Sequence, residues 1–429
     1  MRVSVLIFLS FWMVSSLGAS ELLLEEAIDK ALLASRQIKI SRIDATLAKT
    51  NNLQNIALMS PKVSLGWANA YYDSPIQFDL NGHNAVIRPQ ETSAGFLQII
   101  QPISMLVGLI QKVRADYKTQ KAAETGSELS QVEIAFAAAG SYRQLQQLKS
   151  FNQIAEERVQ LGLRQEQEGK AIFEAGKISK SDLLRVQMAL GNFKVGAANI
   201  KTQYDSSLLA FKDLLGYELT NEVELSKIPL NPEIPTLEKE GSGGISPRLD
   251  IKIAQLTYEA NKNNTWLSYA SFLPNLSAFA RVDKNFINPG AFSQAEFYSL
   301  GLNLSWDIWD GGSRFLNIRS ASLMASKAHL NLLEVTRKAS IDQEQKKLEF
   351  KTAWESLDLQ KTSLEQAEQA YESASEKFKL GAISVTDLLQ SELDLNNAKI
   401  NWAKAITDLD IKHMLVQKAN GQRRPESIL

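Results

Sequence analysis

The stretch Tyr298–Arg314 reads YSLGLNLSWDIWDGGSR, and its pattern changes partway along. Apolar side chains occupy every second position from Tyr298 to Ile308, with mainly small or polar residues between them. Because successive side chains of a strand point to opposite faces, this alternation predicts a strand with one apolar and one polar face. Asp310-Gly311-Gly312-Ser313 ends the alternation, and the chain then continues for about 65 residues with helical spacing and no proline. The stretch therefore predicts a two-faced strand that leads directly into a very long helix.

Composition excludes several classes of protein. The chain has 429 residues, 44% of them hydrophobic, which is enough for a large core. Its 47 Lys and Arg residues nearly balance its 48 Asp and Glu residues, so nothing indicates a nucleic-acid partner. Because the sequence has no cysteine, it excludes disulfides, thiolate metal sites, a cysteine nucleophile and a lipid-modified N-terminal cysteine.

The first 20 residues have the pattern of a cleaved signal peptide. A positive start at Met1-Arg2 precedes the apolar run Val3–Val14 and a group of small residues, and cleavage after Gly18 or Ser20 fits this pattern. The alternative is a retained membrane anchor. Because no later run of about 18 apolar residues exists, we expect no further membrane-spanning helix.

The chain contains the same unit twice. Residues 173–184, FEAGKISKSDLL, resemble residues 378–389, FKLGAISVTDLL, at an offset of 205. Without gaps from Phe173 to Gly216, this offset gives 14 identities in 44 positions. Upstream the offset becomes 213, which matches Ile38-Lys39-Ile40 to Ile251-Lys252-Ile253 and Pro61 to Pro274. The difference of eight residues must lie between the two strands of each unit, where a loop tolerates a change in length.

Each repeat is predicted to contain a helix, two strands separated by a loop, a long helix, a turn and a return helix. The expected elements of the first repeat are a helix over 21–59, strands over 63–72 and 92–102 around a loop at 73–91, and helices over 106–172 and from Ser179 to 215. Those of the second are strands over 275–286 and 297–308 and helices over 313–377 and 386–419. The predicted organisation is a signal peptide (1–20), a first repeat (21–220), a Pro/Gly-rich linker (221–245), a second repeat (246–421) and a tail (422–429).

Four strands are too few for a closed barrel. Two-faced strands of about ten residues in an exported chain suggest an outer-membrane barrel, which must close and needs at least about eight strands. Two copies of this chain supply eight strands, and three supply twelve. The alternative is a soluble β-layer with one buried face. Aromatic residues at or near the strand ends fit interfacial belts; they are Trp67, Tyr71, Tyr72, Phe279, Phe286, Tyr298, Trp306 and Trp309.

These motifs resemble the TolC-like outer-membrane efflux protein family (outer membrane factor). The most specific is Leu304–Arg314, LSWDIWDGGSR, which is similar to the family's apolar strand ending followed by Asp-Gly-Gly-x-Arg. The two Gly-x-Ile-Ser tips and Leu273-Pro274 before a strand also match. The first repeat differs, because Gln101–Leu106, QPISML, lacks the Asp-Gly-Gly, and its strand end is expected to have a different shape.

The resemblance implies a mainly α fold with β: an internal two-fold repeat, long coiled-coil-like helical hairpins and four strands contributing to a shared 12-stranded trimeric outer-membrane barrel. It also implies a homotrimer in outer-membrane lipid, with a large helical portion in the periplasm. The expected partners are a periplasmic adaptor (membrane fusion protein) and an inner-membrane pump of RND or ABC type. The expected function is passive export of drugs, metal ions or secreted proteins through an efflux or type I secretion system, without a cofactor.

The two glycine tips are candidate sites. Glycine suits the reversal of a helical hairpin, so turn geometry alone explains it; the sharper interpretation is an adaptor-docking surface. Asp387 fits the first turn of a helix, or it lines a narrow periplasmic gate where three copies would meet. Gln390 stands where some family members have a second acid. The candidate docking residues are Gly176, Ile178, Ser179, Asp182, Gly381, Ile383, Ser384 and Asp387.

The strand-to-helix junction is the other candidate. It comprises Trp306, Asp310, Gly311, Gly312 and Arg314. Asp310 and Arg314 are either an N-cap with a surface cation or an ion pair between neighbouring segments.

Nothing indicates an enzyme or a metal site. His83, His329 and His413 are isolated in the sequence, and no phosphate loop or nucleophile elbow is present. The preferred interpretation is therefore an outer-membrane exit duct, and its main rival is a periplasmic coiled-coil scaffold without a pore. A secreted hydrolase lacks any catalytic constellation in the sequence.

Overall fold

The computed structural model describes residues 21–80, 83–220, 222–226, 248–287 and 294–429. The predicted signal peptide and most of the predicted linker lie outside these residues. In chain order the elements are α1 (Leu24–Ala34), α2 (Arg36–Ala57), β1 (Lys62–Tyr71), β2 (Ile76–Leu80), β3 (His83–Arg88), β4 (Glu91–Pro102), α3 (Met105–Glu174), α4 (Lys180–Leu215), α5 (Leu249–Ala270), β5 (Asn275–Asn285), β6 (Glu296–Ser305), α6 (Ser313–Lys379) and α7 (Val385–Ala419). None of the helices in the described part is both long enough and apolar enough to cross a membrane.

Two compact units divide the chain. The helical unit comprises Met1–Arg36, Gln131–Ser246 and Asp342–Leu429, and the sheet unit comprises Gln37–Ser130 and Pro247–Ile341. The long helices α3 and α6 contribute to both units. Each of the two sequence repeats therefore supplies segments to both units.

In the helical unit, α3 lies against α4, and α6 lies against α7. Gln187 of α4 donates a hydrogen bond to Glu166 of α3 at 3.3 Å, and Lys412 of α7 donates one to Glu349 of α6 at 2.7 Å. A buried cluster includes Phe350 of α6 together with Ile406 and Leu409 of α7. The chain end, Ile428 and Leu429, packs against this cluster.

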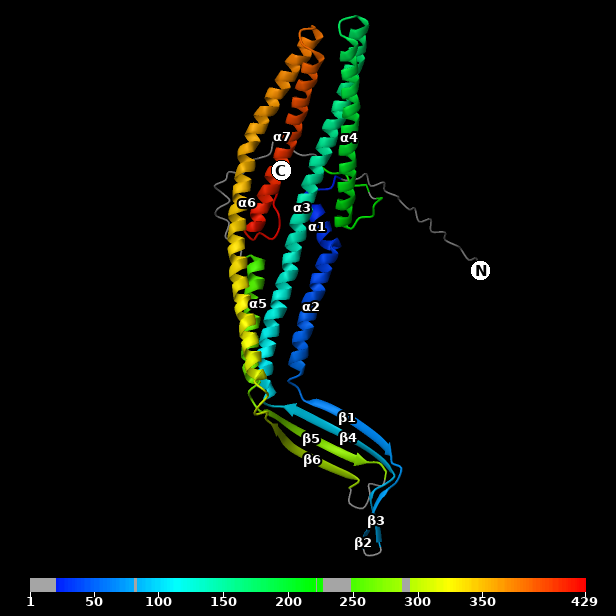
Figure 1. Ribbon diagram of the computed structural model, residues 1–429, viewed down its shortest axis with the longest axis vertical. Helices are drawn as coiled ribbons and strands as arrows, with labels where there is room; N and C mark the ends of the chain where they lie inside the picture. Colours follow the sequence, from blue (N-terminus) through cyan, green and yellow to red (C-terminus); the bar gives the residue numbers. More distant parts are fainter. Residues whose placement is uncertain (1–20, 81–82, 221, 227–247, 288–293) are drawn as a thin grey trace, which may run out of the picture. The chain divides into compact units, whose positions relative to one another are not determined.

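The sheet unit contains a four-stranded antiparallel sheet in the order β1-β4-β5-β6 (Figure 1). The central pair, β4 and β5, joins the two repeats. In the part of the chain that the structure describes, β1 and β6 are edge strands, each paired on one side only.

The β1–β4 and β5–β6 hairpins have the same register. Lys62 lies opposite Ile100 in the first hairpin, and Asn275 lies opposite Ser305 in the second. The sequence offset of 213 takes Lys62 to Asn275, and the offset of 205 takes Ile100 to Ser305. The two hairpins are therefore equivalent strand for strand and residue for residue.

Both hairpins also contain a glycine under an aromatic ring. Gly66 lies opposite Phe96, and Gly301 lies opposite Phe279. A side chain at Gly66 would overlap the Phe96 ring, and a Cβ at Gly301 would lie 3.0 Å from the Phe279 ring. In each hairpin the aromatic ring covers the backbone of the glycine opposite it. The first hairpin has glycine on its first strand and phenylalanine on its second, and the second hairpin has the reverse.

The structure corrects two expectations about the first repeat. The helix expected over 21–59 is interrupted at Ser35, whose ψ of 117° is not helical. The loop expected over 73–91 contains the antiparallel hairpin β2–β3. Its sequence signals are the alternation of Ile76 and Phe78 and the dipeptide Asn81-Gly82, which is typical of two-residue hairpin loops. That dipeptide lies outside the described residues.

Candidate functional site

The two tips of the helical unit have the same backbone geometry. Gly176 has φ 71° and Gly381 has φ 75°, a region that favours glycine. The N–H of Gly176 donates to the carbonyl of Phe173 at 2.8 Å, and that of Gly381 donates to the carbonyl of Phe378 at 2.9 Å. Turn geometry therefore favours glycine at both tips, as the sequence predicted.

A capping box begins each return helix. The Ser179 hydroxyl accepts from the N–H of Asp182 at 3.2 Å, and the Ser179 N–H donates to the Asp182 carboxylate at 3.2 Å. Ser384 and Asp387 repeat both contacts at 3.2 Å. The hydrogen bonds from the Ser179 hydroxyl and backbone lower the pKa of Asp182. Both aspartates thus serve as first-turn caps, which leaves the docking and gate roles as predictions.

Arg185 and Thr386 connect the two tips. Nη1 of Arg185, on α4, donates to the hydroxyl of Thr386, on α7, at 2.6 Å. Asp387 is exposed beside this contact. Gln390 is also exposed, and its side-chain amide donates to the carboxylate of Asp394, four residues further along α7, at 3.0 Å.

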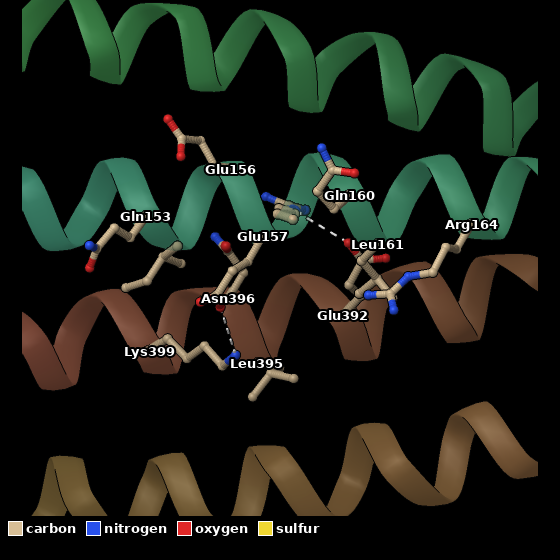
Figure 2. Close-up of a pocket in the computed structure, with 12 residues that line it drawn as sticks. Gln153, Glu156, Glu157, Gln160, Leu161, Arg164, Glu392, Leu395, Asn396 and Lys399 are labelled. Atoms are coloured by element: carbon tan, nitrogen blue, oxygen red, sulfur yellow. Dashed lines mark hydrogen bonds and ion pairs between the residues drawn. The ribbon is translucent and has the colours of Figure 1, made fainter.

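A polar groove of about 850 Å³ lies along α3 and α7 in the helical unit (Figure 2). Glu392 of α7 lines it but is only 2% exposed. Its carboxylate accepts from Nε of Arg158 at 3.4 Å and from Nε2 of Gln165 at 3.0 Å, both on α3. On the rim, Nζ of Lys399 lies 3.7 Å from the Glu157 carboxylate. The groove therefore contains one buried acid and an exposed ion pair.

Burial raises the pKa of Glu392, and the hydrogen bond from Gln165 and the charge of Arg158 offset only part of this effect. Tyr371 of α6 lies close enough to be affected by the same carboxylate. Its pKa is raised by burial and by the negative charge of Glu392. Three helices thus meet at one protonatable group. In the described part of the chain, no group of three or more potential ligands is placed to bind a metal ion.

The strand-to-helix junction is fixed by Asp310. Its carboxylate accepts from the N–H of Gly312 at 3.1 Å and from that of Arg314 at 3.0 Å, which satisfies two free donors at the start of α6. Nε of Arg314 lies 3.3 Å from the same carboxylate. Asp310 therefore caps the start of α6 from three residues before its first residue, Ser313, and its ion pair is local to the junction. Gly311 and Gly312, with φ 70° and 85°, allow the tight turn.

The corresponding junction of the first repeat has a different shape, as expected. The N–H of Ile103 donates to the carbonyl of Leu276 on β5 at 2.9 Å, and the Ser104 hydroxyl accepts from the N–H of Leu276 at 2.8 Å. The neighbouring strand β5 thus replaces the Asp-Gly-Gly turn in holding this strand end.

One face of the sheet is apolar across all four strands. Rows of directly opposite residues cross it, and exposure along these rows reaches 83% at Leu65 and 86% at Leu300. Water would penalise such a surface, whereas lipid would not. The rows are Val63, Ile99, Ala280 and Leu300, followed by Leu65, Leu97, Val282 and Tyr298.

The opposite face is mixed and mostly polar. Gln98, Arg281 and Ser299 form one row of it. Arg281 makes a hydrogen-bonded ion pair with Asp283 at 2.7 Å and lies 4.0 Å from the centre of the Phe96 ring. This face can therefore border water.

Sequence reasoning missed Glu392 and Arg185. Glu392 lies seven residues after Val385 and four after Leu388 on the buried stripe of α7, so an acid at an apolar position was the available signal. Arg185 carries no such signal, because its partner Thr386 is on another helix.

Comparison with known proteins adds to this geometry. Residues 245–422 match the family described as outer membrane efflux protein. No curated protein sequence matches the chain. The solved structure of the CmeC outer membrane channel of Campylobacter jejuni has a TM-score of 0.79 at 17% identity and covers 94% of this chain and 87% of that one.

Two further channels have the same fold. The outer-membrane channel OprN has a TM-score of 0.81 at 17% identity, covering 93% of this chain and 90% of that one. The outer membrane protein VceC of Vibrio cholerae has a TM-score of 0.77 at 16% identity, covering 93% and 96%. The resemblance that the motifs at 304–314 and 378–389 indicated is thereby confirmed: this chain has the TolC-like fold, and its second repeat carries the match to the outer membrane efflux protein family.

Proposed function

We propose that the chain is one third of an outer-membrane exit duct. Three copies would contribute twelve strands to one barrel and their helices to a tunnel in the periplasm. Substrates would pass through it passively. The energy for transport would come from an inner-membrane pump of RND or ABC type, reached through a periplasmic adaptor that contacts the tips at Gly176 and Gly381.

The sheet is the observation that carries this proposal. It has an apolar face that is continuous over four strands, and within the described residues of one copy its two edge strands, β1 and β6, have no partner on their outer sides. Lipid offers no hydrogen bonds to a strand edge, and each unpaired polar group there costs several kcal/mol. Both properties are satisfied together when copies of the chain close a barrel with the apolar face outward.

The gate is proposed for the tips of α7. There Asp387 is exposed beside the contact between Arg185 and Thr386. Three-fold symmetry would bring three Asp387 carboxylates near one axis, where they would repel one another and their combined negative charge would attract cations. Gln390 adds no charge, so this ring would carry a single acid from each copy. Replacing Asp387 by Asn should weaken block of the channel by divalent cations, and unchanged block would contradict the gate assignment.

The function is tested by measuring mass and conductance on one preparation. The full-length protein is extracted from outer membranes in mild detergent, and its mass is determined by light scattering corrected for detergent. We expect three chains per particle and stepwise conductance in planar bilayers. A monomer that conducts nothing would overturn the proposal.

The alternative is a periplasmic coiled-coil scaffold, in which the sheet is a soluble cap. Its support is the length of the helices α3 and α6, which contain 70 and 67 residues. A duct should remain with the outer membrane after washing at high salt, whereas a scaffold should be released. Retention after washing, together with conductance, would exclude the scaffold.

A further inference from the structure

We propose a residue-level register for the seam between copies: β6 of one copy pairs antiparallel with β1 of the next, so that Leu304 lies opposite Trp67 of the partner subunit. This inference rests on the proposed function, since it needs copies that close a barrel. It goes further by stating which backbone groups meet at the seam. In the same register, Leu302 faces Asn69 of the partner subunit and Leu300 faces Tyr71 of the partner subunit.

The register follows from the seam inside the chain. Within one copy, β4 of the first repeat pairs with β5 of the second, and Ile99 lies opposite Ala280. The repeat offsets take Ile99 to Leu304, on β6, and Ala280 to Trp67, on β1. The two hairpins already have equal registers under these offsets. The pairing of β6 with β1 of the next copy should therefore have the same register as the pairing of β4 with β5 inside one copy.

The faces of the strands provide an independent check. On β6 the apolar side chains are at even positions such as Leu300 and Leu302, and on β1 they are at odd positions such as Leu65 and Trp67. The transferred register places even positions opposite odd ones, so the apolar face continues across the seam, with Asn69 of the partner subunit as a polar residue within it. A shift by a single residue would place apolar side chains opposite polar ones and break this face.

The register also explains where β6 ends in a single copy. The sequence predicts a strand through Ile308, but β6 ends at Ser305, and Trp306 is 59% exposed. The residues of β4 that correspond to Trp306 and Asp307 are Gln101 and Pro102, and both are paired with β5. Pairing with the partner subunit would therefore extend β6 to about Asp307.

Cysteine pairs test this register, because the sequence has no cysteine of its own. Directly opposite side chains at the non-hydrogen-bonded positions of antiparallel strands have Cβ atoms close enough for a disulfide. The test variant combines Asn303→Cys with Ala68→Cys, on the face opposite the apolar one. Asn303→Cys with Ala70→Cys, and Ser305→Cys with Ser64→Cys, report registers shifted by two residues in either direction.

A matched control exists inside the chain. Gln98 and Arg281 are directly opposite each other, and the repeat offsets convert them into Asn303 and Ala68. The variant Gln98→Cys with Arg281→Cys should therefore oxidise within one chain and protect both thiols from alkylation. That outcome would show that the oxidant reaches this face and that the geometry suits a disulfide.

Cross-linking is measured on the intact assembly in outer membranes, using a mild oxidant and a non-reducing denaturing gel. We expect the Asn303 and Ala68 variant to form linked dimers and trimers at least about tenfold faster than either shifted pair. Equal or faster linking by a shifted pair would overturn the register, and so would no linking in an assembly that light scattering shows to be trimeric. A monomeric protein would instead overturn the proposed function.

Discussion

Replacing Asp410 by Asn should open the helical unit locally around the C-terminal half of α7. Asp410 is fully buried, and Arg143 of α3, its partner, is only 4% exposed. The carboxylate accepts from Nε of Arg143 at 2.6 Å, from the N–H of Ile428 at 2.8 Å and from the hydroxyl of Ser427 at 3.0 Å. This one group therefore ties α3, α7 and the chain end together.

The magnitude follows from the charge that the substitution leaves behind. Asparagine has nearly the same size, so packing is retained, but the Arg143 guanidinium keeps its positive charge in a site closed to water. Removing one partner of such a buried pair costs about 3–5 kcal/mol. Replacing both partners, with Arg143→Met and Asp410→Leu, removes the unpaired charge and should recover most of this loss.

Amide hydrogen exchange on the purified assembly measures the effect. A loss of about 3 kcal/mol corresponds to a decrease of more than a hundredfold in the protection of the amides of residues 405–419. The control is Glu355→Gln, which removes an exposed ion pair with Lys351 on α6 and should change protection little. The reasoning is refuted if Asp410→Asn has no larger effect than this control, or if the double variant is worse than the single one.

Three further predictions concern the tips, the groove and the sheet. Gly381→Ala should destabilise its tip by about 1 kcal/mol because φ there is 75°, whereas Gly191→Ala, inside α4 with open space around it, should stabilise by a similar amount; thermal unfolding of both variants shows the opposite signs. Because the pKa of Glu392 is raised in the folded state, its protonated form stabilises the fold at low pH, and this contribution is lost as pH rises through the folded pKa. Glu392→Gln should therefore flatten the pH dependence of amide protection around the groove. A pH dependence equal to that of the wild type would contradict this. Leu300→Arg should reduce assembly in the outer membrane by about 2–4 kcal/mol, whereas Ser299→Arg on the other face should have little effect; heat-modifiable mobility of the assembly on gels compares the two.

Much of the fold could be predicted because the sequence has a clear strand alternation, long segments with helical spacing and an internal repeat. The long helices begin and end within two residues of the expected positions, since glycine turns at Gly176 and Gly381 and the cap at Asp310 mark their ends. The offsets of 205 and 213 also predicted which strands are equivalent, and the sheet register agrees with them.

Other features depend on contacts that no local pattern records. The sequence predicts a loop where the structure has the β2–β3 hairpin, because Pro75, Gly82 and Pro89 are stronger signals than a short alternation. The contact between Arg185 and Thr386 joins residues 201 positions apart, and neither residue is unusual on its own helix. The roles of Asp387 and Gln390 at a gate require neighbouring copies, so a single chain leaves them as predictions.

The equal registers of the two hairpins have a consequence for the evolution of the proposed twelve-stranded barrel. A ring of six identical half-length chains would satisfy the same backbone pairing as three full-length chains. Fusion of two half-length genes would link neighbouring halves covalently in pairs, and the two halves of each fused chain could then diverge in sequence. Arg185 already corresponds to Gln390 of the other half, and Thr386 to Ser181. The contact between Arg185 and Thr386 joins the tips of two helical hairpins that differ in sequence. In a ring of six identical chains the two tips would carry the same residues.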